Sequence, residues 1–291
     1  MSDNGNVAVL GFGTMGAGIA QVCALAGSEV VVLEESEERL EDGRQRLEAF
    51  LGEGVRREKV MEEERNEALA RVRGTTEVGD LAGAGVVIEA VVEDLETKRA
   101  LLPVVADVVG EGAIMATNTS ALSVTELAAT VPRPERFGGL HFFNPAPLMR
   151  LVEVVAAVQT SEETLDFLES FAKEIGKEPV RTKDRPGFLV NRLLMPYLNQ
   201  VVQAYDDGLA TAEDMDVALE GGLGYPMGGL KLLDLIGLDV HLYATSAAYE
   251  QTHDPHLAPP PLLSRMVDAG YLGRKSGRGF HDYSDGNGGR S

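Results

Sequence analysis

The chain has 291 residues, of which 46 are acidic and 26 are basic, so its formal net charge at pH 7 is -20. Such a negative surface repels phosphate backbones, which excludes whole-surface binding to nucleic acid, and a hydrophobic fraction of 44% excludes a disordered chain. No apolar run reaches the ~18 residues that cross a bilayer, no signal peptide is expected, and the single cysteine, Cys23, favours a reducing compartment. We therefore expect a soluble, cytoplasmic protein.

From residue 6 to about residue 183, short β-branched runs alternate with amphipathic stretches. The predicted strands are 6–10, 29–33, 86–90, 113–117, 137–142, 151–156 and 178–182, and the predicted helices are 14–26, 37–51, 58–72, 95–109 and 162–175. This alternation is typical of a parallel, doubly wound α/β sheet of the Rossmann type. The highly charged segment 36–72 is predicted to form a helical pair inserted after the second strand.

The pattern changes near residues 183–187. Beyond them, apolar residues follow helical spacing with no convincing strand, in segments 188–209, 211–222 and 228–251. We predict two domains, a Rossmann domain over residues 1–185 and an all-α domain over residues 186–291. Pro196 is expected to kink the first helix of the second domain.

Two further features of the C-terminal part are assigned no function. His253 and His256 are predicted to lie in a loop, and no metal site is expected because no further ligand cluster is nearby. Residues 286–291 are predicted to form a frayed tail.

A glycine-rich turn follows the first predicted strand and opens the first predicted helix. In the sequence Gly11-Phe-Gly13-Thr14-Met15-Gly16, the first glycine permits a tight turn, the second lets the backbone approach a pyrophosphate, and the third allows close helix–strand packing. Backbone N–H groups at Thr14 and Met15 and the helix dipole would then hold the phosphates. The alternative is a structural turn that binds no nucleotide.

Glu34 ends the second predicted strand, where the dinucleotide-binding fingerprint places an acid. A carboxylate there accepts hydrogen bonds from the adenosine ribose hydroxyls and repels a 2′-phosphate. With Glu35 beside it and no arginine immediately next to it, the sequence favours NAD over NADP as the cofactor.

His141 and Glu153 are candidate catalytic residues because of where they lie in apolar strands. Glu153 shares a face with Leu151 and Val155, and a carboxylate in such a strand is costly unless it is paired. An imidazole on a neighbouring strand is the partner we expect. Such a pair fixes the histidine tautomer and suits a general base, whereas His141 alone would more often be a satisfied core histidine.

Several further motifs carry a resemblance to a known family. They are Thr-Asn-Thr-Ser-Ala at 117–121, Gly-Leu-His-Phe-Phe-Asn-Pro at 139–145, Pro-Gly-Phe-Leu-Val-Asn-Arg at 186–192, and the segments 224–228, 233–239 and 273–280. The chain resembles the L-3-hydroxyacyl-CoA dehydrogenases in their short single-function form, often called 3-hydroxybutyryl-CoA dehydrogenase. The resemblance implies hydride transfer between C3 of a 3-hydroxyacyl-CoA and NAD in fatty acid metabolism, and a homodimer formed through the helical domain.

The same resemblance implies roles for individual residues. Ser120 would hydrogen-bond the substrate oxygen, and Asn191 would orient the substrate and His141. Because Ser120 follows a strand and Asn191 opens the helical domain, we expect a cleft between the domains. The further cofactor contacts that the resemblance implies are Glu93, Lys98, Asn118, Asn144 and Lys275.

The chain also departs from the family pattern. Ala121 stands where the family often has a second serine, and the lysine that some members use for the CoA phosphate has no clear match. Arg44 or Arg46 is predicted to bind the CoA phosphate instead. Near the C-terminus, a basic, glycine-rich cluster is formed by Arg274, Lys275 and Arg278, and it predicts either an anion-binding loop or a solvated turn.

Two other functions remain open on sequence alone. Gulonate-type sugar-acid dehydrogenases share this fold and the His–Glu pair, and some relatives are NAD-binding proteins without activity. The segments 186–193 and 225–228 are more similar to the acyl-CoA branch, and the complete set of Ser120, His141, Glu153 and Asn191 favours an active enzyme.

Overall fold

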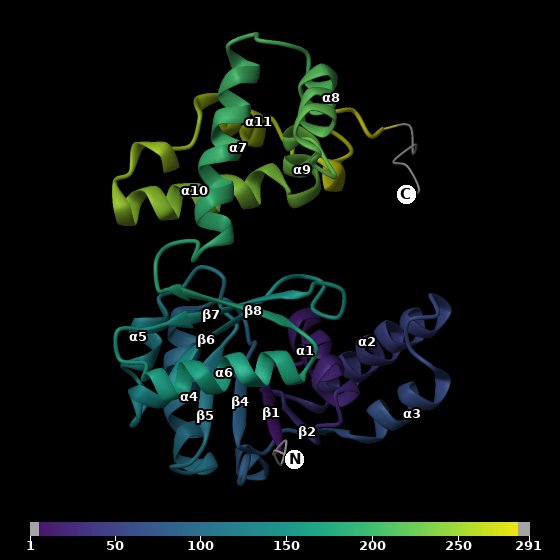
Figure 1. Cartoon of the computed structure of the whole chain (residues 1–291), viewed down its shortest axis with the longest axis vertical. Coiled ribbons are helices and arrows are strands. Elements are labelled where there is room, and N and C mark those ends of the chain that lie inside the picture. The colour runs from purple at the N-terminus through teal and green to yellow at the C-terminus, as the bar shows by residue number, and fades with distance from the viewer. Residues whose placement is uncertain (1–5, 285–291) are drawn as a thin grey trace. The chain divides into compact units, whose positions relative to one another are not determined.

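The structure is a computed structural model that describes residues 6–284. It divides into two compact units, and the boundary between them falls after Phe188. The first unit is an α/β domain and the second is helical, so the predicted fold class is confirmed (Figure 1). The tail predicted for residues 286–291 lies outside the described residues. Within residues 6–284, no helix has both the length and the apolar character needed to cross a membrane.

The first unit is built on one eight-stranded sheet. Its strands are β1 (Val7–Leu10), β2 (Val30–Leu33), β3 (Val72–Thr75), β4 (Val86–Glu89), β5 (Ile114–Thr117), β6 (Phe137–Phe142), β7 (Leu151–Ala156) and β8 (Glu178–Lys183). They lie in the order β3-β2-β1-β4-β5-β6-β7-β8. The order reverses direction between β1 and β4, and the carboxyl ends of strands at such a point are where nucleotides bind in open α/β sheets.

The sheet is mixed, not wholly parallel as the sequence predicted. β7 runs antiparallel to β6, and every other neighbouring pair is parallel. Only residues 143–150 connect β6 to β7. A parallel return needs a crossover of a dozen or more residues, so this short connection permits only the antiparallel arrangement.

Helices cover both faces of the sheet. They are α1 (Thr14–Leu25), α2 (Glu37–Arg56), α3 (Glu62–Ala70), α4 (Leu95–Val109), α5 (Val124–Ala128) and α6 (Glu162–Glu174). Alternate residues of β1 enter different cores: Val7 and Val9 pack with α1, α2 and α6, whereas Ala8 and Leu10 pack with α4 and α5. Both faces are therefore buried, which accounts for the continuous apolar character of the inner strands.

The inserted helical pair is present, with different limits from those predicted. α2 continues through Gly52 and Gly54 to Arg56, beyond the predicted end at residue 51. α3 ends at Ala70, and the chain then forms β3, which the sequence analysis assigned to no strand. The four residues of β3 include Arg73 and Gly74 and have no apolar run, so their strand conformation depends on pairing with β2.

The second unit contains five α-helices within the described residues. They are α7 (Val190–Asp206), α8 (Ala212–Leu223), α9 (Gly229–Ile236), α10 (Leu238–Thr252) and α11 (Pro261–Asp268). α7 is continuous through Pro196. Gly237, with φ of +102°, separates α9 from α10 where the sequence predicted one segment. The core of this unit includes Leu198, Leu230 and Leu233.

Two buried acids hold this helical unit together by accepting backbone hydrogen bonds. Asp216 accepts from the N–H groups of Leu230 at 2.9 Å and Lys231 at 3.1 Å. Asp234 accepts from the N–H groups of Phe280 and His281, both at 2.9 Å. The motifs around residues 228–239 and 273–280 therefore have a structural use, which is to fix the chain that follows α11.

Candidate active site

The glycine-rich turn joins β1 to α1 and is open at its middle. Gly11 has φ of +94°, and a Cβ added to it would lie 2.8 Å from the carbonyl oxygen of Ala90. A Cβ on Gly16 would lie 1.9 Å from the carbonyl oxygen of Gly11, whereas a Cβ on Gly13 would meet nothing within 4 Å. Gly11 and Gly16 are thus required for backbone packing, and Gly13 leaves space for a ligand at the N-terminus of α1.

Glu34 lies beside this turn, at the carboxyl end of β2. Its Oε1 accepts a hydrogen bond from the N–H of Phe12 at 2.7 Å, and its Oε2 accepts from the N–H of Glu35 at 3.0 Å. The carboxylate is half-buried. The open glycine turn, the start of α1 at Thr14 and this carboxylate fit the pyrophosphate and ribose of a dinucleotide.

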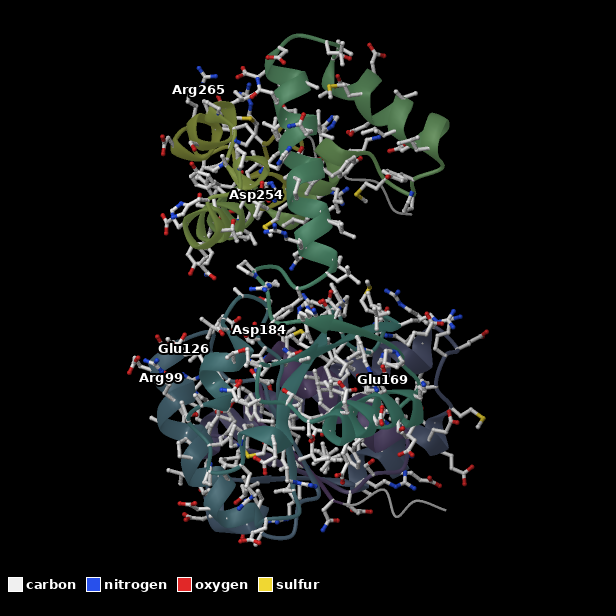
Figure 2. The ribbon with its side chains drawn as sticks, turned by 60° about the vertical axis from the view of Figure 1, so that its left-hand side comes forward. Arg99, Glu126, Glu169, Asp184, Asp254 and Arg265 are labelled. Atoms are coloured by element: carbon white, nitrogen blue, oxygen red, sulfur yellow. The ribbon has the colours of Figure 1, made fainter. Side chains whose placement is uncertain are left out.

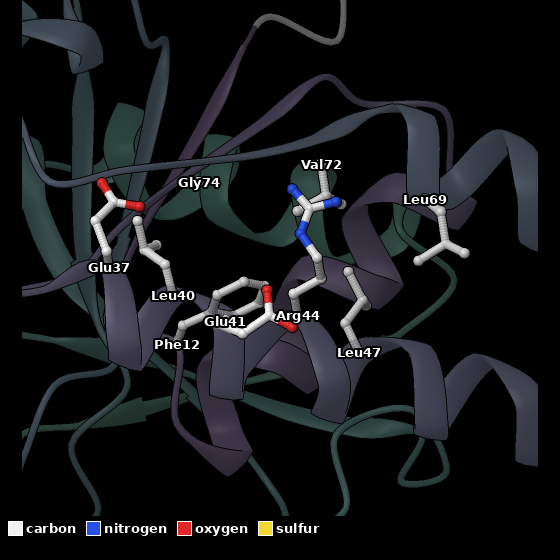
Figure 3. A pocket seen from close by; sticks show the side chains of 9 residues that line it. All are labelled: Phe12, Glu37, Leu40, Glu41, Arg44, Leu47, Leu69, Val72 and Gly74. Atoms are coloured by element: carbon white, nitrogen blue, oxygen red, sulfur yellow. The ribbon is translucent and has the colours of Figure 1, made fainter.

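A cavity of about 250 Å³ lies next to the turn, between α2, α3 and β3 (Figure 3). The Arg44 side chain extends across it toward Val72, and the Phe12 ring forms part of its wall. Arg46 donates from Nη1 to the carbonyl oxygen of Phe12 at 3.4 Å. The two arginines predicted to bind the CoA phosphate therefore both lie near the turn that carries Phe12.

His141 and Glu153 lie directly opposite each other on β6 and β7. The distance between Nδ1 of His141 and Oε2 of Glu153 is 2.6 Å, and the two residues are 5% and 1% exposed. The imidazole also packs against Phe143 and Phe188, with ring centroids 4.6 Å and 5.5 Å away. Because the carboxylate engages Nδ1, Nε2 is the ring nitrogen left for a reacting proton.

The loop after β5 carries Ser120 and is held by Glu93. Oε1 of Glu93 accepts hydrogen bonds from the Ser120 N–H at 2.9 Å and from the Thr119 hydroxyl at 2.6 Å. Partial burial raises the pKa of Glu93, but the positive charge of Lys98 and these hydrogen bonds outweigh it, so the pKa lies below its ordinary value. Glu93 is therefore ionised at neutral pH, and its charge fixes the Ser120 loop.

Asn118 joins this loop to the strand that carries His141. Its side-chain oxygen accepts a hydrogen bond from the Phe142 N–H at 2.9 Å. Strands β5 and β6 are parallel neighbours, so the loop with Ser120 and the carboxyl end of β6 lie at the same edge of the sheet. Asn118, Ser120 and His141 therefore lie at or near the same edge of the sheet.

A buried charge pair at this edge was missed by the sequence analysis. Glu89 is 0% exposed and Lys98 is 1% exposed, and Nζ of Lys98 lies 2.6 Å from Oε1 of Glu89. Glu89 is the last residue of β4, after Val86-Val87-Ile88. An acid within an apolar strand singled out Glu153, and the same signal was available for Glu89.

The remaining predicted residues lie in other places. Asn191 is the second residue of α7, in the helical unit, and Asn144 is exposed in the loop after β6. Lys275 is ion-paired with Asp239 at 2.6 Å. The guanidinium groups of the other two cluster members, Arg274 and Arg278, lie 5.5 Å and 4.3 Å from the ring centroids of Tyr283 and Tyr271. All three cations of the predicted basic cluster thus have partners within the helical unit.

Two surface contacts hold α5, the helix that follows the Ser120 loop (Figure 2). Arg99 of α4 pairs with Glu126 of α5. Asp184, just after β8, accepts hydrogen bonds from the Ser123 hydroxyl at 2.9 Å and the Thr125 N–H at 2.7 Å. The described residues contain no group of three or more His, Cys, Asp or Glu placed to hold one metal ion.

A second cavity, of about 540 Å³, lies between α1, α2 and the loop after β6. Its walls include Pro145 and Leu148; Lys59 contributes positive charge, whereas Arg57 is paired with Glu53 on the same wall. Gln21 also lines the cavity; it is 3% exposed, and its Oε1 has no hydrogen-bond partner among the described residues.

The chain is similar to known proteins over nearly its full length. Residues 6–185 match the family model for the 3-hydroxyacyl-CoA dehydrogenase NAD binding domain, and residues 187–283 match the model for the C-terminal domain of 3-hydroxyacyl-CoA dehydrogenase. A 3-hydroxybutyryl-CoA dehydrogenase of Mycobacterium tuberculosis is 46% identical over 279 residues, covering 95% of this chain and 98% of the relative.

Two further relatives extend the comparison. The mitochondrial hydroxyacyl-coenzyme A dehydrogenase of Sus scrofa is 40% identical over 285 residues, covering 96% of this chain and 91% of the relative. The crystal structure of a (S)-3-hydroxybutyryl-CoA dehydrogenase from Ralstonia eutropha matches with a TM-score of 0.92 and 42% identity, covering 96% of this chain and 98% of that one.

Proposed function

Because this chain belongs to the 3-hydroxyacyl-CoA dehydrogenase family, we propose that it oxidises a short-chain L-3-hydroxyacyl-CoA, such as 3-hydroxybutyryl-CoA, with NAD and catalyses the reverse reaction. The short-chain preference is supported by 41–46% identity with relatives named 3-hydroxybutyryl-CoA dehydrogenase. The buried contact between His141 and Glu153 is the observation that carries the mechanism.

His141 acts as the general base in this proposal. Its Nε2 accepts the proton of the C3 hydroxyl, and Glu153 stabilises the resulting imidazolium through Nδ1. Bound NAD supplies the acceptor for the hydride that leaves C3. Ser120 donates a hydrogen bond to the substrate oxygen, and Asn191 orients the substrate. In the reverse reaction, Nε2 returns the proton to the oxygen.

The open glycine turn is proposed to bind NAD. Its glycines and the first residues of α1 would hold the pyrophosphate, and Glu34 would accept hydrogen bonds from the ribose hydroxyls. The remaining cofactor contacts in this proposal are Glu93, Lys98, Asn118, Asn144 and Lys275.

The second cavity is proposed to bind the pantetheine arm and phosphates of CoA. Its wall begins at Pro145, a few residues after His141, and is largely apolar, as a pantetheine chain requires. Lys59 is exposed at this cavity and would attract a phosphate. This cavity is a stronger candidate than the one beside Arg44, which adjoins the proposed adenosine site.

The CoA assignment is tested by removing one charge at a time. Lys59→Met should raise KM for 3-hydroxybutyryl-CoA and leave KM unchanged for the N-acetylcysteamine thioester, which has no phosphates. Arg44→Met and Arg46→Met are matched controls. If either arginine variant raises KM selectively for the CoA ester and Lys59→Met does not, the phosphate site is at the arginines.

We also propose a homodimer formed through the helical unit. Large apolar side chains are exposed there in the single chain, including Leu193 at 68%, Leu209 at 76% and Tyr243 at 74%. A partner helical unit would cover these side chains and remove their apolar surface from water. Light scattering of the purified chain should give twice the monomer mass, and a monomeric mass at micromolar concentration would contradict the dimer.

The activity is tested by a kinetic comparison of C4 to C16 L-3-hydroxyacyl-CoA substrates with NAD and NADP. The proposal predicts the highest kcat/KM with the C4 substrate and NAD. Oxidation of gulonate in place of every acyl-CoA would instead support a sugar-acid dehydrogenase. NADH binding with no turnover of either class would support an inactive relative.

A further inference from the structure

We propose that Glu89 is a positioning residue for the reaction: it holds the Lys98 ammonium in place and, through Lys98 and Glu93, fixes the loop that carries Ser120. The inference rests on the proposed function for the role of Ser120. It adds a residue that neither touches substrate nor belongs to the glycine turn. Its basis is a continuous set of short contacts at the carboxyl edge of the sheet.

Glu89 lies at the centre of the proposed ligand-binding edge. In the sheet register, it is next to Leu10, the last residue of β1, and next to Thr117, the last residue of β5. Ala90, which follows it, packs against Gly11 so closely that a Cβ on Gly11 would lie 2.8 Å from the Ala90 oxygen. A shift of Glu89 would therefore displace both the glycine turn after β1 and the loop after β5.

Three donors fix the Glu89 carboxylate. Oε1 accepts from the Lys98 ammonium at 2.6 Å and from the Val91 N–H at 2.8 Å, and Oε2 accepts from the Thr117 hydroxyl at 2.6 Å. The carboxylate thus joins β4, β5 and α4, and it has little freedom to move. The Lys98 ammonium is consequently held in one position near the carboxyl edge of the sheet.

Lys98 passes this constraint to Ser120 through Glu93. Its Nζ lies 3.2 Å from Oε2 of Glu93, and Oε1 of the same carboxylate accepts from the Ser120 N–H at 2.9 Å. An ammonium has three N–H donors, and Glu89 and Glu93 are its two partners among the described residues. The Lys98 side chain is 1% exposed, so both carboxylates hold an ammonium that has little contact with solvent.

A purely structural role does not account for this arrangement. A buried ion pair is often no more stable than apolar side chains of similar volume, because both charges lose their hydration. Here two carboxylates share one ammonium, so the cluster keeps a net negative charge beside a site proposed for a polyanionic cofactor. Such a cluster destabilises the fold and repels an anionic ligand. Stability alone therefore does not explain it, whereas a role in placing Lys98 and the Ser120 loop does.

Positioning and simple electrostatics predict opposite effects of neutralising Glu89. If Glu89 acted only as a nearby negative charge, Glu89→Gln would tighten NADH binding, because a repulsion would be removed. If Glu89 positions Lys98, the same substitution weakens NADH binding by about tenfold or more, since the charged hydrogen bond that fixes the ammonium is lost. Displacement of Ser120 should also lower kcat by about 100-fold.

The experiment compares Glu89→Gln, Lys98→Met and the double variant in the full-length protein. NADH affinity is measured by fluorescence, and melting temperature is measured by circular dichroism. Turnover is measured with 3-hydroxybutyryl-CoA as the substrate. Each single variant leaves a buried charge with fewer partners and should lower the melting temperature by roughly 10 °C. The double variant removes both charges and should recover most of that loss.

The kinetic results of the double variant decide the role of Glu89. The proposal predicts NADH affinity and kcat equal to those of Lys98→Met, although the melting temperature has recovered. Recovery of kinetics together with stability would show that the pair is only structural and would overturn the proposal. Losses that add in the double variant, or wild-type kinetics and NADH affinity in Glu89→Gln, would also overturn it.

The NADH measurement separates this proposal from the proposed function. If the wild type binds NADH but never turns over an acyl-CoA, the proposed function fails while the affinity comparison of the three variants still tests Glu89. If the wild type is active and Glu89→Gln binds NADH more tightly, the positioning role fails and the proposed function stands.

Discussion

Both units of this molecule bury acidic side chains, but they give them different partners. In the first unit, Glu89 and Glu153 contact the charged or titratable side chains of Lys98 and His141 at the carboxyl edge of a sheet. In the helical unit, Asp234 accepts hydrogen bonds from the backbone N–H groups of Phe280 and His281, and Asp216 accepts from two backbone N–H groups and from the His281 imidazole. One acid type therefore controls another side chain, and the other fixes the course of the chain.

The difference shows how a buried acid should be interpreted. A carboxylate bonded to backbone N–H groups replaces hydrogen bonds that secondary structure would otherwise supply, so its value is in stability. A carboxylate bonded to an imidazole or ammonium determines tautomer, charge and orientation, which are properties that chemistry uses. Sequence alone gives the same signal, an acid in an apolar run, in both cases.

The largest expected effect comes from removing the carboxylate paired with the proposed base. Glu153→Gln should lower kcat by about 100- to 10,000-fold, because the amide cannot stabilise an imidazolium as a carboxylate does. Steady-state kinetics at saturating NAD measure this loss. A kcat within a few-fold of the wild type would place Glu153 with the structural acids.

Asp234→Asn should lower the stability of the fold and leave kcat unchanged. Loss of the charge weakens bonds to the N–H groups of Phe280 and His281, and we expect the free energy of unfolding to fall by about 2–4 kcal/mol. Urea denaturation measures this change, and kcat per folded molecule should match the wild type. A large loss of kcat without loss of stability would remove the distinction between the two kinds of acid.

Two histidines of the helical unit, the buried His241 and the partly buried His281, extend the comparison to the pH dependence of stability. His241 donates toward the amide oxygen of Asn199, not a carboxylate, and burial lowers its pKa from 6.5 to about 4. Between pH 6.5 and pH 4 the unfolded chain therefore binds the proton first, so stability should fall as pH falls, by about 3 kcal/mol over the window. His281 has its pKa raised by its hydrogen bond to Asp216, so its contribution is complete at low pH and is lost as pH rises through the folded pKa.

The His241 contribution is isolated by comparing two proteins. Urea denaturation of the wild type and of His241→Gln at pH 7 and pH 4.5 should show a smaller drop in the free energy of unfolding for the variant. Equal drops in the two proteins would contradict a neutral, desolvated His241.

Glu34 gives the smallest expected effect, and it does not fit simply into either of the two kinds of acid. It accepts backbone N–H bonds, like the structural acids, yet it is half-buried beside the open glycine turn. Glu34→Ala should reduce the preference for NAD over NADP by about 10- to 100-fold, with kcat/KM for each cofactor as the measurement. Unchanged discrimination would mean that Glu34 only holds Phe12 in place.

Much of the fold could be predicted because its signals are local. Strands β6 and β7 have the limits expected for residues 137–142 and 151–156, and the three valines of β7 give that strand a strong signal of its own. β3 could not be predicted, because Val72–Thr75 has little strand character of its own and depends on β2, which is distant in sequence. The antiparallel β7 was predictable in principle from the short connection that precedes it.

The site was predictable where residue type and position coincide. His141 and Glu153 were paired in advance because an acid in an apolar strand requires a partner, and the structure places them 2.6 Å apart. Glu89 was overlooked because its partner, Lys98, comes from a helix and was interpreted only through the resemblance. The second cavity depends on side chains from α1, α2 and the loop after β6, and no local pattern indicates that they meet.

The central claim is that His141, paired with Glu153, accepts the hydroxyl proton as hydride leaves C3, and His141→Gln tests it most directly. NADH formation from L-3-hydroxybutyryl-CoA and NADH affinity by fluorescence are measured on the same preparation. The account predicts a loss of kcat of at least about 100-fold with NADH affinity unchanged. Turnover close to that of the wild type would contradict it.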